Sequence, residues 1–341
     1  MQVATIGIDI AKHVFQVHGI TAAGQVVIQK RLRRTELLRF FGKLDPCLVG
    51  MEACGTSHHW ARELTALGHR VKLMPPSYVK PYVRRNKNDA ADAEAICEAV
   101  SRPTMRFVTI KSMEQQGVLM MHRVRSVLVR QRTMMANALR GHMAEFGIIV
   151  RQGLKAVREL GRMIEDPRHL IPATARGALR VLVAQLVGIE EQIQQIEAQL
   201  MAWHRADEMS RRLASIPGVG PVTASAIAAT VSDPGQFRSG REFAAWLGLV
   251  PRQKASGSKN VLSGISKRGD KYIRRLLISG AVAILRYSRA KPTPERAWVN
   301  TLLQRRPAKV AAVALANKTA RIAWALMTKK ESYQAPLAVA A

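Results

Sequence analysis

Hydrophobic residues in the first hundred positions form short runs and alternations that are typical of strands separated by helices. Residues 3–10, 14–20 and 26–32 are rich in β-branched side chains and are separated by short turns, so they predict an antiparallel meander of three strands. The elements expected to follow are a helix after Thr35, a strand at 47–52, a helix at 59–67, a strand at 71–74 and a helix at 89–100. This alternation predicts a mixed α/β layer.

The middle of the chain has a different pattern, a seven-residue hydrophobic repeat. Its positions are Leu179, Leu182, Leu186, Ile189, Ile193, Ile196, Leu200 and Trp203. Met121, Val124, Leu128, Met135 and Ala138 follow the same period. The repeat is typical of a coiled-coil seam, so we expect two long helices, joined near Pro167 and Pro172, to form an antiparallel hairpin.

Such a hairpin has two interpretations. It could be a helical core that packs only on itself. Alternatively, because two helices alone leave apolar surface unburied, it could be a stalk that binds a partner.

Charge changes the picture, because the chain is strongly basic. Lys and Arg number 53 against 24 Asp and Glu, which gives a formal net charge of +29. From position 209 onward there are 23 Lys and Arg against 5 Asp and Glu, so 23 − 5 = +18 of that charge lies in the C-terminal 133 residues. An excess of this size favours a polyanionic partner, and its asymmetry is typical of a nucleic-acid-binding domain.

Other partners and compartments are less well supported by the sequence. An anionic membrane surface is the alternative polyanionic partner. However, no apolar run approaches the length of a spanning helix and no signal peptide is evident, so we expect no membrane association. Cys47, Cys54 and Cys97 form no CxxC pair, which argues against a disulfide framework and a cysteine zinc site. We therefore expect a reducing compartment, the cytosol or nucleoid.

Four carboxylates occupy positions that suit a metal site. Asp9 and Glu52 each follow an apolar strand-like run, and Asp89 and Asp92 lie one turn apart at the start of the helix at 89–100. Oxygen ligands on adjacent elements suit Mg²⁺, especially at a scissile phosphate. The element order βββαβαβα fits a ribonuclease-H-like α/β fold, in which the four acids together favour a metal site. Separately, Asp9 also fits a phosphate-binding strand of an actin-like ATPase, and Asp92 could stabilise a helix N-terminus.

Two basic-region motifs suggest contacts with a nucleic-acid backbone. Gly218 and Gly220 lie in the turn Ile216–Pro221, which precedes a helix of small residues. This arrangement is typical of a helix-hairpin-helix that binds backbone phosphates. The alternative interpretation is a plain tight turn. The second motif is a flexible cationic segment that follows a helix at 241–247. It contains Arg252, Lys254, Ser256, Lys259, Lys267 and Arg268. It could be an exposed loop that touches phosphates, or its serine could attack phosphorus with the cations stabilising the oxyanion.

Together these motifs resemble one transposase family. The segments 7–12 and 88–93, with Glu52 between them, are similar to the DEDD signature of the RuvC-like insertion-sequence 110 family, relatives of the Piv DNA invertase. The segments 216–220, 245–251, 256–257, 264–269 and 316–318 are similar to its transposase domain in the same order. Residues 15–19 resemble the 1111 subgroup.

The resemblance implies both architecture and activity. It implies a RuvC-like DEDD domain at 1–108, a coiled-coil helical middle at 109–208, a mainly α, serine-bearing basic domain at 209–330 and a tail at 331–341. It further implies an RNA-guided recombinase that excises and inserts its own element, guided by an element-encoded noncoding RNA that pairs with DNA. Asp9, Glu52, Asp89 and Asp92 would bind Mg²⁺, and Ser256 would be the covalent nucleophile. Carboxylates and serine would come from different protomers of a dimer or tetramer bridged by the coiled coil.

Two other functions stay open at this stage. A RuvC-type Mg²⁺-dependent nuclease that resolves branched DNA would need the acids and not the serine. A non-catalytic nucleic-acid-binding protein would need only the fold and the charge.

Overall fold

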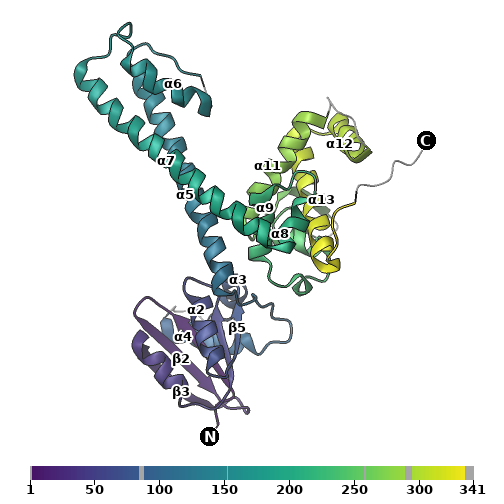
Figure 1. Cartoon of the computed structure of the whole chain (residues 1–341). Helices are drawn as coiled ribbons and strands as arrows, with labels where there is room; N and C mark the ends of the chain where they lie inside the picture. Colours follow the sequence, from purple (N-terminus) through teal and green to yellow (C-terminus); the bar gives the residue numbers. More distant parts are fainter. Residues whose placement is uncertain (1, 84–87, 152, 257–258, 289–293, 335–341) are drawn as a thin grey trace. The chain divides into compact units, whose positions relative to one another are not determined.

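The computed structural model describes residues 2–83, 88–151, 153–256, 259–288 and 294–334, and it divides into two compact units. The first unit comprises Met1–Met113 and the second Glu114–Ala341 (Figure 1).

A five-stranded sheet organises the first unit. Its strands are β1 (Thr5–Ile10), β2 (Val14–Ile20), β3 (Val26–Arg33), β4 (Leu48–Glu52) and β5 (Arg70–Met74). The spatial order is β3-β2-β1-β4-β5, in which β1, β2 and β3 pair antiparallel and β4 pairs parallel to both β1 and β5. The expected meander and the mixed α/β layer are therefore confirmed.

Helices cover both faces of this sheet. On one face α1 (Leu37–Phe41) and α2 (Ser57–Ala66) pack against Ile6, Ile8 and Met51, whose side chains are fully buried. The helix expected after Thr35 begins only at Leu37, because a 3₁₀ turn comes first. A short helix, α3 (Pro76–Val79), precedes α4 (Asp89–Val100).

The other face of the sheet is held close to α4 by two glycines. A Cβ on Gly7 would lie 2.2 Å from the carbonyl oxygen of Ala93, and one on Gly50 would lie 2.7 Å from the Cβ of Val100. No larger residue fits at either position without moving the helix. Because side chains alternate along a strand, the residues two positions further on also face α4, and these are Asp9 and Glu52.

An antiparallel helix pair begins the second unit (Figure 1). The pair consists of α5 (Met113–Ala144) and α7 (Ala173–Ala206). Trp203 Nε1 donates a hydrogen bond to Glu114 Oε1 at 3.0 Å, and further along the pair Arg125 Nε donates to Glu197 Oε1 at 2.8 Å. Of the eight positions of the expected repeat on α7, Leu179, Leu186, Ile193 and Leu200 are each at most 4% exposed, and the other four are half-buried.

The repeat expected on α5 borders the buried face of the helix. Met121 and Met135 pack against core clusters and Leu128 and Ala138 are half-buried, whereas Val124 is 40% exposed. The most deeply buried row lies beside it, and its members are Val118, His122, Arg125, Val129, Arg132, Ala136, Leu139 and Met143, each of them buried or half-buried. Hydropathy counts His122, Arg125 and Arg132 as surface positions, so the sequence pattern does not reveal this second row.

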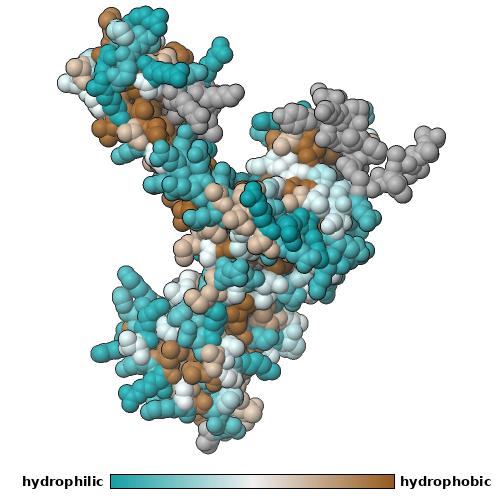
Figure 2. All heavy atoms as spheres, viewed as in Figure 1, coloured by the Kyte–Doolittle hydropathy of each residue, from teal (hydrophilic) through white to brown (hydrophobic). Residues whose placement is uncertain are grey.

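The connection between the two long helices also differs from the expectation of a simple hairpin. A third helix, α6 (Leu154–Glu165), lies in the connection and buries Leu160 and Ile164 in the same cluster as Leu179 and Leu186 of α7. Figure 2 shows hydrophobic patches interrupting the hydrophilic surface of this region, and Met134, Val181 and Val187 are each more than half exposed.

The remainder of the second unit is mainly helical. Its elements are α8 (Glu208–Ala214), α9 (Pro221–Thr230), α10 (Gly240–Trp246), β6 (Pro251–Ser256), β7 (Lys259–Ile265), α11 (Lys271–Ser288), α12 (Pro294–Arg305) and α13 (Ala308–Lys329). One core joins most of these helices, and α13 contributes a stripe of buried alanines to it. Small side chains let α10 and α11 approach α13 closely.

A buried histidine ties α5 to this C-terminal core. His122 Nδ1 lies 3.1 Å from the Tyr272 hydroxyl of α11, and His122 Nε2 lies 3.2 Å from Ser225 Oγ of α9. Ser225 Oγ donates its proton to the Pro221 carbonyl at 2.7 Å, so it accepts from Nε2–H, which leaves Nδ1 to accept from Tyr272. This arrangement suits neutral imidazole. Burial, aided by the charge of Arg125, lowers the pKa of His122 to about 4.

We expect acid to destabilise the chain through this histidine. Between pH 6.5 and 4 the unfolded chain takes up a proton at His122 that the folded chain does not, so folding stability falls as pH falls, by about 3 kcal/mol at pH 4. His122→Gln removes this titration. Urea unfolding of both proteins at pH 7 and pH 4 should therefore show a smaller pH dependence in the variant.

The comparison must isolate His122, since burial also lowers the pKa of His18 in the first unit. Subtracting the pH dependence of the variant from that of the wild type removes this shared contribution. Identical pH dependence in the two proteins would contradict the assignment of a neutral, buried His122.

Candidate functional site

Parallel strand register places the first two acids side by side. Gly7 pairs with Gly50 and Ile8 with Met51, so Asp9 and Glu52 are the next residues along β1 and β4. Both acids lie at the carboxyl ends of their strands and are half-buried. In sheets with parallel strands this edge is where ligands bind.

A capped helix start brings two more acids to this edge. The Asn88 side chain accepts a hydrogen bond from Ala91 N at 2.7 Å and so fixes the first turn of α4, which carries Asp89 and Asp92. Asp9, Asp89 and Asp92 each offer a carboxylate oxygen, and these three atoms lie within 4.8 Å of one another. Glu52 neighbours Asp9 by register but does not join this close group of three.

The three-acid cluster has the chemistry of a cation site. Carboxylates this close repel one another unless a cation or a proton lies between them. Asp89 is exposed and the other two acids are half-buried, so an ion has access from solvent. Carboxylate oxygens are ligands that hard divalent cations prefer, so the residues present fit a divalent metal.

Cys54 is a neighbour of the acids that sequence reasoning used only to argue against disulfide and zinc chemistry. Burial raises the pKa of the Cys54 thiol, and the charges of Glu52 and Asp9 raise it further. The thiol is therefore neutral at neutral pH and does not compete with the carboxylates as an anionic ligand. Two residues later, Thr56 adopts a left-handed backbone (φ 70°), so the chain turns sharply between β4 and α2.

The predicted nucleophile lies in the second unit, on a two-stranded hairpin. Strands β6 and β7 pair antiparallel, and Ser256 is the register partner of Lys259 at the far end of the hairpin. The side chains of Ser256 and Lys259 lie outside the described part of the chain. Arg252 and Lys254 extend exposed from β6.

A buried arginine, which sequence reasoning missed, fixes the base of this hairpin. Arg274 is 8% exposed, and its Nη1 donates to the carbonyls of Leu247 and Arg268, each at 2.8 Å. The loop after α10 and the loop after β7 cross so closely that a Cβ on Gly269 would lie 1.7 Å from the Trp246 carbonyl oxygen. The result is a rigid loop after β7 that holds Lys267 and Arg268 exposed. A cation buried among carbonyls is not recognisable from hydropathy, because it looks like one more surface charge.

Packing explains the glycines of the predicted helix-hairpin-helix. The turn between α8 and α9 carries Gly218 in a left-handed conformation (φ 80°). A Cβ on Gly280 of α11 would lie 2.0 Å from the Gly218 carbonyl oxygen, so this turn packs backbone against backbone. Gly220 is exposed and precedes the first residue of α9. The turn is therefore rigid, and its phosphate-binding role stays a prediction.

The predicted site residues thus form three groups, of which the turn with Gly218 and Gly220 is one. Asp9, Asp89 and Asp92 are gathered in the first unit, with Glu52 beside Asp9. Arg252, Lys254, Ser256 and Lys259 share the β6–β7 hairpin in the second unit, and Lys267 and Arg268 follow it. Among the described helices, none is both long and apolar enough to cross a membrane.

Comparison with known proteins places this arrangement in a family. A transposase model of the DEDD type matches residues 6–148, and the model described as the transposase IS116/IS110/IS902 family matches residues 210–294. The two matches cover the acids and the hairpin respectively. A DEDD nuclease-like domain suggests the use of a divalent metal, in accord with the three-acid cluster.

Similar proteins extend over nearly the whole chain. A probable family 20 transposase of Pseudomonas aeruginosa is 52% identical over 98% of this chain and 99% of its own length. The transposase for insertion sequence element IS1328 of Yersinia enterocolitica is 42% identical, over 96% of this chain and 97% of its own. The transposase for element IS1111A of Coxiella burnetii is also 42% identical, over 96% and 91%. The chain therefore belongs to the IS110 family of transposases, enzymes that cut and rejoin DNA.

Proposed function

We propose that this chain is a Mg²⁺-dependent, RNA-guided DNA transposase that excises and inserts its own insertion sequence through a covalent serine intermediate. The observation that carries the proposal is the approach of Asp9, Asp89 and Asp92 to within 4.8 Å of one another at the carboxyl edge of the sheet. Three acids at this spacing are costly to the fold without a cation. Their exposure at the edge of the sheet would let an ion held there contact a phosphate of the substrate.

Asp9, Asp89 and Asp92 would hold Mg²⁺, and Glu52 would complete the ligand set. When bound, Mg²⁺ supplies Lewis-acid stabilisation of negative charge on a scissile phosphate. The chain's own contribution is position: β1, β4 and the capped start of α4 fix the carboxylates before DNA arrives, so little reorganisation is needed.

Ser256 would supply the nucleophile. Its hydroxyl oxygen would form a bond to phosphorus as the bond from phosphorus to the leaving sugar oxygen breaks, and the hydroxyl proton would end on that sugar oxygen. The reverse step, with a new sugar hydroxyl, rejoins DNA without an external energy source. Arg252, Lys254 and Lys259 would stabilise the negative charge on the phosphoryl oxygens during both steps.

The acids and the serine belong to different units of the chain. We infer that acids from one protomer act with the serine of another in a dimer or tetramer assembled through the coiled coil of α5 and α7. Support comes from large apolar side chains, such as Met134 and Val187, that the helix pair leaves exposed.

An element-encoded noncoding RNA would select the DNA, and the basic second unit would hold both nucleic acids. Phosphate contacts would come from Lys267, Arg268 and the turn that contains Gly218 and Gly220. Such contacts give affinity without sequence information, so base pairing by the RNA would supply specificity.

Reconstitution tests the proposal. Purified chain is mixed with DNA that carries the element ends and a target, with Mg²⁺, and with or without RNA transcribed from the noncoding part of the element. Recombinants should require RNA and Mg²⁺, and changing the RNA segment that pairs with the target should redirect insertion. Recombination without RNA would overturn the guided mechanism. Nicked products that are never rejoined would instead indicate a RuvC-type nuclease.

A further inference from the structure

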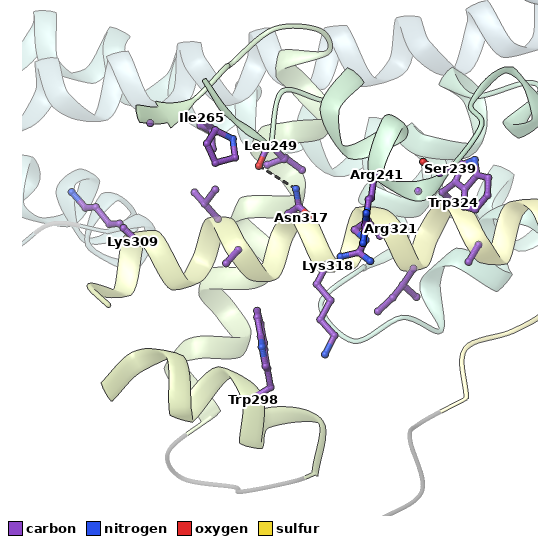
Figure 3. Close-up of a pocket in the computed structure, with 18 of the residues that line it drawn as sticks. Ser239, Arg241, Leu249, Ile265, Trp298, Lys309, Asn317, Lys318, Arg321 and Trp324 are labelled. Carbon is purple, nitrogen blue, oxygen red and sulfur yellow. Dashed lines mark hydrogen bonds between the residues drawn. The ribbon is translucent and has the colours of Figure 1, made fainter. Parts of the chain in front are cut away.

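An elongated groove follows the exposed face of α13, and none of the functions above uses it (Figure 3). Its volume is about 1470 Å³. Residues from Lys309 to Ala325 line it, and sixteen steps at about 1.5 Å each make its floor about 24 Å long. That length suits an extended chain-like ligand better than a compact metabolite.

The groove combines an apolar floor with a cationic rim. The floor is formed by Val310, Val313, Ala314, Ile322 and Ala325 of α13, with Leu249 and Ile265 opposite. Arg241, Lys309, Lys318 and Arg321 supply positive charge, and no acidic side chain occurs among the described residues that line it. This composition points to an anionic ligand that also has apolar surface.

An aromatic wall closes one side. Trp298 extends from α12 toward α13 with its side chain 42% exposed, and Lys318 Nζ lies 4.9 Å from the centre of its ring (Figure 3). On the other side, the Asn317 side-chain amide donates to the Leu249 carbonyl at 3.2 Å, which holds the base of the β6–β7 hairpin against α13. An exposed indole beside a lysine is a platform for stacking a nucleobase while its phosphate is neutralised.

We propose that this groove binds a single strand of DNA, unpaired next to the cleavage site. The inference rests on the proposed role of Ser256, because the groove begins at the hairpin that carries this serine. Pro251, Ser263 and Gly264 belong to the β6–β7 hairpin and also line the groove. Ser256 lies at the far end of the hairpin, five residues or about 17 Å along β6 from Pro251, so a strand released there would follow the hairpin to the groove.

Three considerations favour this occupant. A duplex keeps its base faces stacked inside and would present only phosphates and groove edges to the apolar floor, whereas an unpaired strand presents base faces to Trp298. A second copy of the chain has 24 Asp and Glu against 53 Lys and Arg, so it offers few acidic side chains to pair with this cationic rim. DNA, rather than RNA, fits because the family acts on DNA and because the methyl group of thymine gains from contact with an apolar floor.

The test uses the full chain and fluorescent 12-mers of oligothymidine, oligouridine and duplex DNA. Trp298→Ala should weaken binding of oligothymidine about tenfold, as expected when one base-stacking platform is lost, and should change duplex binding less than twofold. Trp298→Phe, which keeps an aromatic face, should recover most of the affinity. Neither substitution alters charge, so general phosphate attraction is unchanged.

Two further measurements locate the strand. Lys318→Gln, in the groove, should weaken oligothymidine binding more than Lys329→Gln, which removes the same charge from the last turn of α13 outside the groove. Oligonucleotides containing 5-iodouracil should photocrosslink to the peptide that contains Trp298.

Each outcome decides the question. If the wild type binds duplex DNA and oligothymidine but Trp298→Ala binds both equally well and the crosslink maps elsewhere, the groove assignment fails and the proposed function stands. If the wild type binds no DNA at all, both fail. If Trp298→Ala weakens the binding of oligouridine more than that of oligothymidine, the groove binds RNA and the assignment to DNA is overturned. If Trp298→Ala instead changes the oligomeric state, the groove is an interface with a second protomer.

Discussion

Asp9→Asn is expected to abolish DNA strand cleavage, with a loss of about 10³-fold or more, because a catalytic metal supplies several kcal/mol of transition-state stabilisation and Asp9 is one of the three clustered acids proposed to hold it. The substitution keeps the shape of the side chain and removes one of three mutually repelling charges. The first unit should therefore stay folded, and without metal its thermal midpoint should be equal to or slightly above that of the wild type. Supercoiled plasmid cleavage and thermal unfolding measure the two effects.

Metal binding gives a readout independent of activity. We expect Mg²⁺ to bind the folded wild type and neither the unfolded chain nor Asp9→Asn, so it should raise the thermal midpoint of the wild type alone. Glu98→Gln is the matched control, since Glu98 lies on α4 but pairs with Arg102 away from the cluster. Normal cleavage by Asp9→Asn, or an equal loss in Glu98→Gln, would contradict the metal-site assignment.

The local pattern of hydrophobic and polar residues was sufficient to predict the strands of the first unit. Each strand is either an alternation of hydrophobic and polar residues or a short hydrophobic run, as is typical of half-buried and buried strands. The sequence therefore predicted β1 to β5 within two residues of their ends in the structure. Asp9 could be singled out because a carboxylate at the end of an apolar strand is costly without a partner. Its proximity to Asp89 and Asp92 followed from element order, because α4 must cross the sheet to be buried.

Tertiary packing determined what the sequence pattern missed. His122 and Arg125 lie on the buried side of α5, where particular partners stabilise them: Ser225 and Tyr272 for the histidine, and Glu197 for Arg125. These partners are 72 or more residues away, so no local rule finds them. The groove along α13 also depends on tertiary packing, since its walls come from α10, α12 and the β6–β7 hairpin, which lie apart in the sequence.

Ser256→Ala is expected to remove the covalent protein–DNA adduct and to reduce cleavage to background, a loss of roughly 10⁴-fold or more, because the substitution removes the attacking oxygen. DNA binding should stay near the wild-type value, since the exposed cations Arg252 and Lys254 are retained. Denaturing gels with end-labelled DNA detect the adduct, and filter binding measures affinity. Ser263→Ala on the partner strand is the matched control and should keep the adduct.

Mixing the two inactive variants tests how the site is assembled. If acids of one protomer act with the serine of another, an assembly of one Asp9→Asn and one Ser256→Ala protomer contains one site with intact acids and intact serine. Its activity should therefore return to a substantial fraction of the wild-type value. If both groups act within one protomer, every site in the mixture lacks one of them and stays inactive. An adduct that persists in Ser256→Ala alone would move the nucleophile to a neighbouring serine of the hairpin, whatever the mixture shows.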